Sequence, residues 1–452
     1  MIAAEKRNKT TSIRKHGAPR THQPKPGCDQ AKTGLILQED VDLATQTVRW
    51  LKIFYGMAAG SLTILLTSCT NIKAPKTLFV TFHAERDFFE IDTKQIRTFL
   101  NTYTEAFQQS NPDTSIVYIS YPSRQFFNQI EEDSNLSLGP DIIITNQFEA
   151  KELLSRDLIK TLPNQPYFNS IYSPRLQSIA KTKNGYALAP WLIDTQIACF
   201  DKTEIEASPE TMEELEALSA SGKKIGLASN SFGLIWTAGT QGAISELSSL
   251  GSTRSGKATY PAIKKWLRWL QKAARYKNIS FHEDARELGT KLKKKELNWT
   301  TCWGGQLEDL KKTMGHSLGV AALPNGTTSK ALPTFRIYGF SLGKNSSPMQ
   351  LKMEMKFIKT DVNDIAQRKI QLDDIGVLAA NKNVSIPPES SRKLAALNAS
   401  FNEQSQSYAK EWPGLERYGK QNPHLGRTLV DLINGYLDVN EALTMITKPR
   451  ME

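Results

Sequence analysis

Strand-like and helix-like segments alternate along most of this 452-residue chain, and this alternation limits the possible folds more than any other feature. Residues 77–82 (TLFVTF) and 115–120 (SIVYIS) are rich in residues that favour strands. Between these runs, apolar residues recur at the spacing of one helix face. They are Ile96, Phe99, Leu100, Tyr103 and Phe107. The pattern predicts an α/β fold.

The run at residues 140–145 (PDIIIT) has no polar alternation, which is typical of a strand that is buried on both faces in a parallel sheet. A helix is expected through residues 150–154, and the alternation of strand and helix begins again further along the chain. Later strands are predicted at 223–229 and 317–324, and later helices at 263–274, 361–378, 390–408 and 429–445. We therefore expect two α/β lobes with more than one crossing between them.

An apolar run at residues 53–66 follows Arg49 and Lys52, which is the pattern of a secretory signal peptide. The run is shorter than the roughly 20 apolar residues that a membrane-spanning helix needs. A buried core helix is the alternative. Leu66-Thr67-Ser68-Cys69 resembles the bacterial lipobox, and the resemblance implies that Cys69 carries several acyl chains that anchor the chain to a membrane.

The position of this segment is unusual, because 48 residues precede Arg49. Residues 1–47 are polar and basic, with few residues that a core could bury, so we expect them to be disordered. Either the start is misassigned and translation begins near Val48, or residues 1–48 are a long extension of a real signal peptide. The sequence leaves both open.

Composition excludes some classes of protein. Removing residues 1–68 leaves 47 basic and 41 acidic residues, a net charge of about +6, which is mild for a nucleic-acid-binding protein. The basic run at 291–296 (KLKKKE) is expected to be a solvated helix face. The chain has 4 cysteines, too few for a disulfide scaffold. Cys199 and Cys302 could pair, but the sequence does not show their separation.

The sequence lacks complete catalytic and cofactor motifs. Residues 251–258 match part of a phosphate loop, but Ala258 replaces the serine or threonine that would bind Mg²⁺. No zinc-site spacing or nucleophile elbow is present in the sequence, so we predict no metal, no cofactor and no catalytic residues. Four carboxylates could serve glycoside chemistry, although no pairing is visible. They are Asp133, Asp141, Glu283 and Asp284.

Five segments, in order, resemble the extracellular solute-binding proteins, family 1, which are the carbohydrate-binding subunits of ABC importers. The resemblance covers residues 77 to about 445. One of the segments, PETMEEL, has Met212 where the family usually has tryptophan. The segments are residues 139–162 (GPDIIITNQFEAKELLSRDLIKTL), 183–205 (KNGYALAPWLIDTQIACFDKTEI), 209–215 (PETMEEL), 293–310 (KKKELNWTTCWGGQLEDL) and 318–324 (LGVAALP) with 338–347 (YGFSLGKNSS).

The resemblance implies the type II fold of periplasmic binding proteins, in which two lobes joined by hinge crossovers close on a ligand in the cleft between them. The expected organisation has seven parts. They are a disordered extension or misassigned start (1–48), a lipoprotein signal peptide (49–68), a tether (69–76), lobe 1 (77–188), lobe 2 (189–318), a return to lobe 1 (319–362) and C-terminal helices of lobe 2 (363–452).

Ligand contacts are expected from residues at the family's cleft positions and at the strand ends where open α/β sheets bind ligands. Aromatic faces would pack on sugar rings, and polar groups would bond to hydroxyls that closure buries. Ordinary packing is the alternative for each aromatic residue, as it is for Trp266 on its apolar helix face. The candidates are His83, Glu85, Asn146, Gln147, Phe148, Trp191, Asp194, Phe232, Trp236 and Trp303.

The resemblance therefore implies a non-catalytic, monomeric binding protein that delivers a sugar or a similar small polar solute to the transmembrane subunits of an ABC permease. It would be exported and lipid-anchored at the periplasmic or extracellular face of the cytoplasmic membrane. Two alternatives remain open: an exported lipid-anchored carbohydrate-active enzyme on the same fold, and a binding protein for a non-sugar solute such as a polyamine.

Overall fold

The computed structural model of the protein describes residues 76–83, 93–163, 165–251, 259–373, 376–384, 387, 390–403 and 405–448. The predicted extension, signal peptide, lipid-anchored Cys69 and most of the tether lie outside these residues, as does Glu85. Residues 72–452 belong to one compact unit, so the two lobes described below are parts of the same body.

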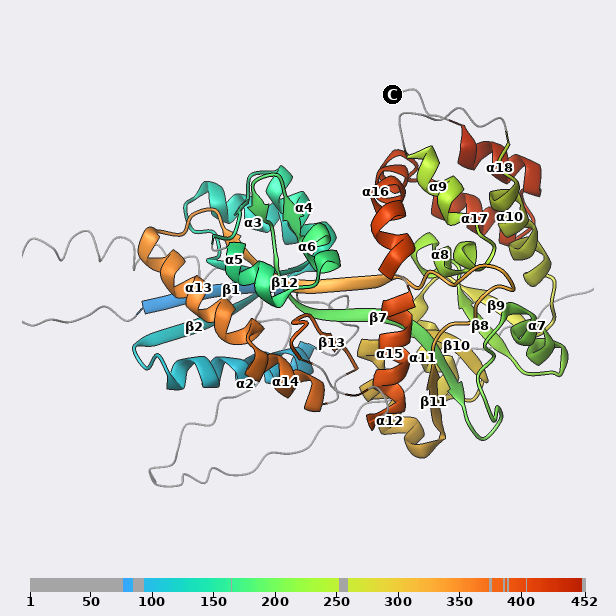
Figure 1. Cartoon of the computed structure of the whole chain (residues 1–452), viewed down its shortest axis with the longest axis horizontal. Helices are drawn as coiled ribbons and strands as arrows, with labels where there is room; N and C mark the ends of the chain where they lie inside the picture. Colours follow the sequence, from blue (N-terminus) through green and yellow to red (C-terminus); the bar gives the residue numbers. More distant parts are fainter. Residues whose placement is uncertain are drawn as a thin grey trace, which may run out of the picture. The chain divides into compact units, whose positions relative to one another are not determined.

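One long strand, β7 (Ala189–Asp201), is shared by both lobes. Its first half pairs antiparallel with β12 (Phe335–Gly343), and its second half pairs antiparallel with β10 (Trp299–Trp303). We call the part around β12 lobe 1 and the part around β10 lobe 2. Figure 1 shows β7 and β12 running side by side from lobe 1 toward lobe 2.

Lobe 1 is built on the strand order β2-β1-β3-β12-β7, with β1 parallel to both β2 and β3 as the sequence predicts. Short strands β4 and β13 extend this sheet. The strands are β1 (Lys76–His83), β2 (Thr114–Tyr121), β3 (Ile142–Asn146), β4 (Ile159–Lys160) and β13 (Leu378–Ala379), and a separate hairpin holds β5 (Lys181–Thr182) and β6 (Gly185–Tyr186). The helices are α2 (Thr93–Gln109), α3 (Phe126–Asn135), α4 (Gln147–Ser155), α5 (Gln165–Ile171), α6 (Pro174–Ala180), α13 (Pro348–Val362) and α14 (Asp364–Leu372), with the short η2 (Ser123–Gln125).

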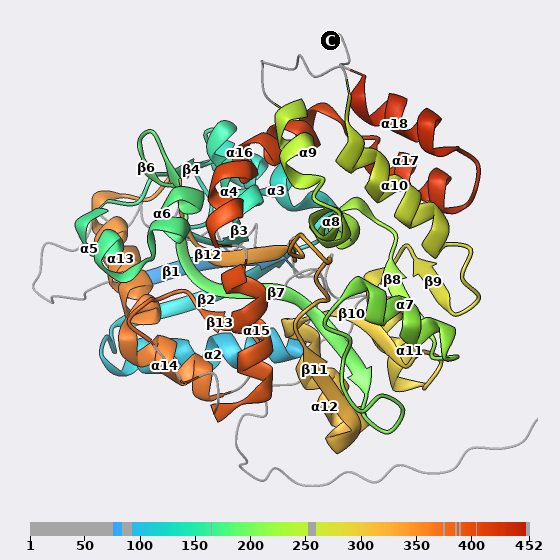
Figure 2. The ribbon, with the colours of Figure 1, turned by 45° about the vertical axis from the view of Figure 1, so that its right-hand side comes forward.

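Lobe 2 continues the sheet in the order β7-β10-β8-β9, and β11 pairs with the far end of β7. The strands are β8 (Ile225–Ala228), β9 (Ile279–His282) and β11 (Leu318–Ala321). The helices are α7 (Met212–Ala220), α8 (Ser231–Thr240), α9 (Ile244–Leu250), α10 (Pro261–Ala273), α11 (Ala285–Lys293), α12 (Leu307–Met314), α15 (Arg392–Glu403), α16 (Ser405–Gln421), α17 (Leu425–Ile433) and α18 (Val439–Thr447), with η3 (Gly304–Gln306) and η4 (Gly315–Ser317). Figures 1 and 2 both show α15 and α16 at the junction of the lobes.

The chain crosses between the lobes at points that differ from the predicted boundaries. Residues 318–321 form β11, which pairs with Ala198–Asp201 in lobe 2, so the return to lobe 1 comes at Phe335 rather than at residue 319. Helix α14 packs in lobe 1 against β13, which pairs with the first half of β7. A strand-like run does not reveal its partner, because pairing depends on residues far away in the chain.

Two predicted C-terminal helices are interrupted. The segment 361–378 contains the end of α13 and all of α14, because Asn363 caps α14 with bonds from the backbone N–H groups of Ile365 and Ala366. The segment 429–445 divides at Gly435, whose φ of 79° is a conformation that ends helices.

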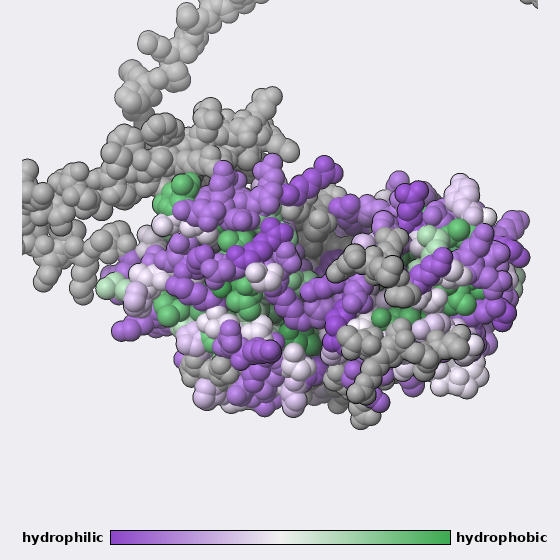
Figure 3. All heavy atoms as spheres, turned by 90° about the horizontal axis from the view of Figure 1, so that it is seen from above, coloured by the Kyte–Doolittle hydropathy of each residue, from purple (hydrophilic) through white to green (hydrophobic). Residues whose placement is uncertain are grey.

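Apolar residues from both lobes form one large buried cluster around the sheet. Trp266 is 0 % exposed and its indole N–H donates to Thr237 at 2.8 Å, which confirms the predicted core position. The face drawn in Figure 3 is mostly hydrophilic, with apolar residues in scattered small groups.

A disulfide joins Cys199 of β7 to Cys302 of β10 inside lobe 2, with 5.8 Å between the Cα atoms. This answers the question that the sequence left open. The next residue after Cys302 is Trp303, so the disulfide ties the end of β10 to the strand that both lobes share.

Helix α13 buries two carboxyl groups in lobe 1. Burial, helped by the nearby Asp141 carboxylate, raises the pKa of Glu354 from 4.5 to about 8, and burial raises the pKa of Asp361 well above its ordinary value. The native state therefore keeps a proton on Glu354 at pH values where the unfolded chain releases it. This contribution to stability is complete below pH 4.5 and is lost as the pH rises toward 8.

We expect Glu354→Gln to remove this pH dependence, because the amide cannot ionise. As the pH rises from 4.5 to 7, the wild-type group should lower the free energy of unfolding by roughly 3 kcal/mol in total. The free energy of unfolding of the variant should therefore rise relative to that of the wild type over this range. Urea unfolding at pH 5, 6.5 and 8 measures the difference. Glu105→Gln, at an exposed position of α2, is the control. Parallel pH profiles for Glu354→Gln and the wild type would contradict the assignment.

Candidate functional site

The first turn of α4, directly after β3, gathers several of the predicted ligand contacts. Asn146 caps the helix, accepting from the N–H groups of Phe148 at 2.9 Å and Glu149 at 3.1 Å. Glu149 completes a capping box and its other oxygen lies 3.1 Å from Nε2 of His83. His83 stacks on Phe126 at 3.7 Å between ring centroids. The structure therefore engages Asn146 and His83 in contacts that hold α4 on β1.

Gln147 is 1 % exposed and binds the crossing strand β12. Its amide N–H donates to the Phe335 carbonyl at 3.3 Å, and its carbonyl accepts from the Ile337 N–H at 2.7 Å. The side chain thus acts as an extra peptide group that continues β3 along β12 past Asn146. It fixes the backbone on both sides of Arg336, at the point where the chain passes between the lobes.

Six aromatic side chains from both lobes contact one another at the crossing. We call them the aromatic cluster: Phe148, Phe232, Trp303, Phe335, Phe401 and Trp412.

Phe148 is the member of the cluster that comes from α4 in lobe 1. Its ring lies 5.7 Å from that of Trp412 on α16 and 6.2 Å from that of Phe232 at the start of α8. Phe232 in turn stacks on Trp303 at 5.6 Å with an interplanar angle of 8°. The cluster therefore includes three predicted contacts, Phe148, Phe232 and Trp303, which the sequence separates by up to 155 positions.

Arg336 adds a cation to the aromatic cluster. Its guanidinium carbon lies 4.8 Å from the centre of the Trp303 ring and 5.6 Å from that of Phe232, within the range of cation–π attraction. Arg336 stands opposite Asp194 in the pairing of β12 with β7. Asp194, another predicted contact, is 0 % exposed and accepts from the Gly305 N–H at 3.2 Å. The guanidinium therefore lies on the aromatic rings, and the Asp194 carboxylate belongs to the opposite residue of the neighbouring strand.

The remaining predicted aromatic residues lie elsewhere. Trp191 is 0 % exposed and packs on Tyr103 and Phe340, with centroid distances of 5.9 and 5.0 Å, in the core of lobe 1. Trp236 is also 0 % exposed, in α8 of lobe 2. Because Trp191 packs in the core of lobe 1 and Trp236 lies within α8 of lobe 2, we leave both out of the proposed site at the strand crossing.

Sequence reasoning missed Arg336, Trp412, Phe335, Phe401 and Arg175, whose guanidinium carbon lies 4.1 Å from the centre of the Phe401 ring. One signal was available for Arg336, which is the single charge in the strand-like run at residues 335–343 (FRIYGFSLG). No sequence pattern near Trp412 marked it, because its contacts with Phe148 and Phe335 depend on how α16 packs.

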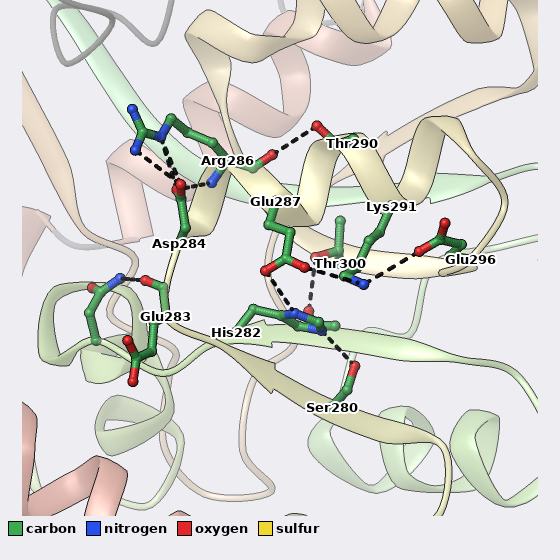
Figure 4. A network of polar contacts seen from close by, with 12 residues as sticks. Ser280, His282, Glu283, Asp284, Arg286, Glu287, Thr290, Lys291, Glu296 and Thr300 are labelled. Atoms are coloured by element: carbon green, nitrogen blue, oxygen red, sulfur yellow. Dashed lines mark hydrogen bonds and ion pairs between the residues drawn. The ribbon is translucent and has the colours of Figure 1, made fainter. Parts of the chain in front are cut away.

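Three of the four carboxylates considered for glycoside chemistry, those of Asp133, Asp141 and Asp284, are engaged in structural contacts. Asp133 accepts from the Tyr121 hydroxyl, and Asp141 accepts from the Phe79 N–H at 2.8 Å. Glu283 and Asp284 precede α11, where Figure 4 shows Asp284 bonded to Arg286. That bond holds the pKa of Asp284 below its ordinary value, whereas a general acid needs a raised pKa. The arrangement does not favour an acid–base pair here.

The basic run at 291–296 lies at the end of α11 and is paired with acids. Lys291 lies 3.3 Å from Glu287 and 3.4 Å from Glu296, and Lys293 lies 2.6 Å from Asp309 (Figure 4 shows the first two pairs). The side chain of Lys291 lowers the pKa of Glu287. Within the described ranges, no group of three or more potential metal ligands comes together, and no helix has the length and hydropathy of a membrane span.

Neither a protein-family model nor a curated protein sequence matches the chain. Solved structures do match its fold. A cyclo/maltodextrin-binding protein complexed with maltotetraose has a TM-score of 0.64 at 12 % identity, covering 84 % of this chain and 98 % of that one. The GacH receptor of Streptomyces glaucescens, solved unliganded and with acarbose, has a TM-score of 0.62 at 14 % identity, covering 82 % and 97 %. Maltose-bound MalE3 of T. maritima has a TM-score of 0.59 at 18 % identity, covering 82 % and 98 %. The predicted two-lobed α/β fold is confirmed.

Proposed function

We propose that the protein is the substrate-binding subunit of an ABC importer, which captures a sugar or a similar small polar solute between its lobes. The observation that carries this proposal is the aromatic cluster with Arg336 and Asp194 at the strand crossing. The structural neighbours support it, because they are described as a receptor solved with acarbose, a cyclo/maltodextrin-binding protein complexed with maltotetraose and a maltose-bound MalE3.

The chemistry of the cluster suits a polyol with apolar ring faces. Indole and phenyl rings offer flat apolar surfaces for the C–H side of a sugar ring, and an arginine and an aspartate on paired strands offer planar donors and acceptors for hydroxyls. Closure of the lobes would bury those hydroxyls, and each one left without a partner would cost about 1–3 kcal/mol. We therefore assign ligand contact to Phe148, Asp194, Phe232, Trp303, Arg336 and Trp412.

Export and lipid anchoring at Cys69 form part of the proposal. The lipobox-like sequence ahead of Cys69 supports them, and so does the Cys199–Cys302 disulfide, since disulfides persist mainly in oxidising compartments. The proposal also includes that the protein is a monomer and delivers its ligand to the transmembrane subunits of the permease. Metabolic labelling with a fatty acid should mark the wild type and not Cys69→Ala. Equal labelling of the two would contradict the anchor.

Thermal unfolding of the purified protein against a panel of ligands tests the binding function. The panel holds mono-, di- and oligosaccharides, compatible solutes and polyamines. A ligand present at about 100 times its Kd should stabilise the native state by roughly 2.7 kcal/mol and raise the unfolding midpoint. A selective shift from a sugar, with the sugar recovered unchanged, is the expected result. Consumption of the sugar would instead favour the enzyme alternative. A rise in the unfolding midpoint with polyamines alone would show that the ligand is a polyamine and not a sugar.

A further inference from the structure

We propose that α4 of lobe 1 and α16 of lobe 2 form an interlobe clasp, which holds the lobes together before a ligand arrives and positions Trp412 at the site. The clasp consists of Phe148 and Lys151 on α4 and of Trp412 and Glu416 on α16. The Lys151 Nζ atom lies 2.8 Å from Glu416 Oε2, and the aromatic rings lie 5.7 Å apart.

The spacing along the two helices explains why both contacts form together. Phe148 and Lys151 are three positions apart on α4, and Trp412 and Glu416 are four positions apart on α16. Residues at these spacings lie on the same face of a helix. One face of α4 therefore meets one face of α16 through an aromatic pair and, about a turn further, an ion pair.

Helix α16 is firmly attached to lobe 2. Its Gly414 lies so close to α9 that a Cβ atom there would fall 2.4 Å from the Ser248 carbonyl oxygen. The Ser248 hydroxyl donates to the Glu411 carbonyl at 2.9 Å, and Arg417 donates to the Gly251 carbonyl at 2.7 Å. A contact between α16 and α4 is therefore a contact between lobes.

Helix α4 is equally attached to lobe 1. Its capping box, the contact of Glu149 with His83 and the bonds from Gln147 to β12 hold the first turn in place. With both helices anchored in their own lobes, separating the lobes must break the clasp.

The Lys151–Glu416 ion pair is less exposed to solvent than the contact of Glu416 with Lys420. Lys151 and Glu416 side chains are 28 % and 17 % exposed, whereas Lys420, 3.8 Å from Glu416 along the same helix, is 73 % exposed. Partial burial reduces the screening by water and salt that weakens surface pairs. Lys151 is therefore the main partner of Glu416, and its loss leaves Glu416 paired only within its own lobe.

The test compares the shape of the ligand-free protein among charge variants by small-angle X-ray scattering. Lys151→Glu and Glu416→Lys should each increase the radius of gyration, because like charges then face each other across the lobes. The double swap, Lys151→Glu with Glu416→Lys, should restore the wild-type value. Lys344→Glu is the matched control, since it breaks an ion pair of the same 2.8 Å length inside lobe 1. If a charge reversal prevents folding, Lys151→Gln replaces it.

An unchanged radius of gyration in the single variants, or failure of the double swap to restore it, would overturn the clasp. A second readout rests on the proposed function. If a ligand of the panel binds, its apparent Kd should rise about fivefold in Lys151→Glu, because a smaller fraction of the variant molecules has the lobes held together in the binding-competent arrangement. The double swap should restore the wild-type Kd. The scattering result needs no ligand, so failure of the sugar assignment and failure of the clasp are distinguishable.

Discussion

Replacing Trp303 with alanine should weaken ligand binding at least about thirtyfold, the largest loss that we expect from any single substitution in the aromatic cluster. A central, desolvated tryptophan in a binding site typically contributes 2 kcal/mol or more on truncation. Trp303 is 4 % exposed, stacks on Phe232 and lies under Arg336, so its removal also disturbs both of these neighbours. Isothermal titration with the ligand identified by thermal unfolding measures the loss.

Two further variants separate ligand contact from general damage. Trp303→Phe keeps a flat ring and should recover part of the affinity. Tyr436→Ala removes an aromatic residue that is 77 % exposed and lies outside the cluster, so it should bind as tightly as the wild type. Wild-type affinity in Trp303→Ala would contradict a site at the strand crossing and would require the ligand to bind elsewhere.

Removing the disulfide should give the largest loss of stability. Cys199 and Cys302 are 103 positions apart, and closing a loop of this length restricts the unfolded chain by an amount worth about 4–5 kcal/mol in the chain-entropy account, with 2–5 kcal/mol typical of measured losses. We expect Cys199→Ala with Cys302→Ala to lower the free energy of unfolding by that typical amount in urea denaturation.

Reductant offers a control for this double variant. It should destabilise the wild type by a similar amount and leave the double variant unchanged, because no bond remains to be reduced. Because Cys302 precedes Trp303, we also expect weaker ligand binding when the disulfide is absent. A double variant as stable as the oxidised wild type would show that the bond does not support lobe 2.

Local sequence patterns predicted most elements of the sheet and their burial. The run at 140–145 became β3, buried and parallel to β1, and the apolar face through Tyr103 and Phe107 became α2. These predictions succeed because a strand or helix depends on residues within a few positions of one another. The interruptions at Asn363 and Gly435 were missed, since a cap and a positive φ break a helix without breaking its apolar pattern.

The candidate site could be predicted only in part. Trp191 and Trp303 both lie in strand-like runs at positions matched to the family's cleft, and no local feature distinguishes them. The register of β7 with β12 and β10 places Trp303 beside the crossing and Trp191 in the core of lobe 1. The predicted contacts Asn146 and Gln147 use their side chains to cap α4 and to hold β12.

By itself, therefore, the sequence determined the class of fold, the location of its main strands and helices, and a set of aromatic residues with special positions. The signal peptide and Cys69 stay predictions from the sequence alone. Only the tertiary structure decided the Cys199–Cys302 bond, the lobe that holds β11, the positions of Arg336 and Trp412, and the contact of α4 with α16. The physical reason is distance along the chain. Local preferences act over a few residues, whereas these contacts join segments that are tens to hundreds of positions apart. Strand register and helix packing decide which of their side chains come into contact.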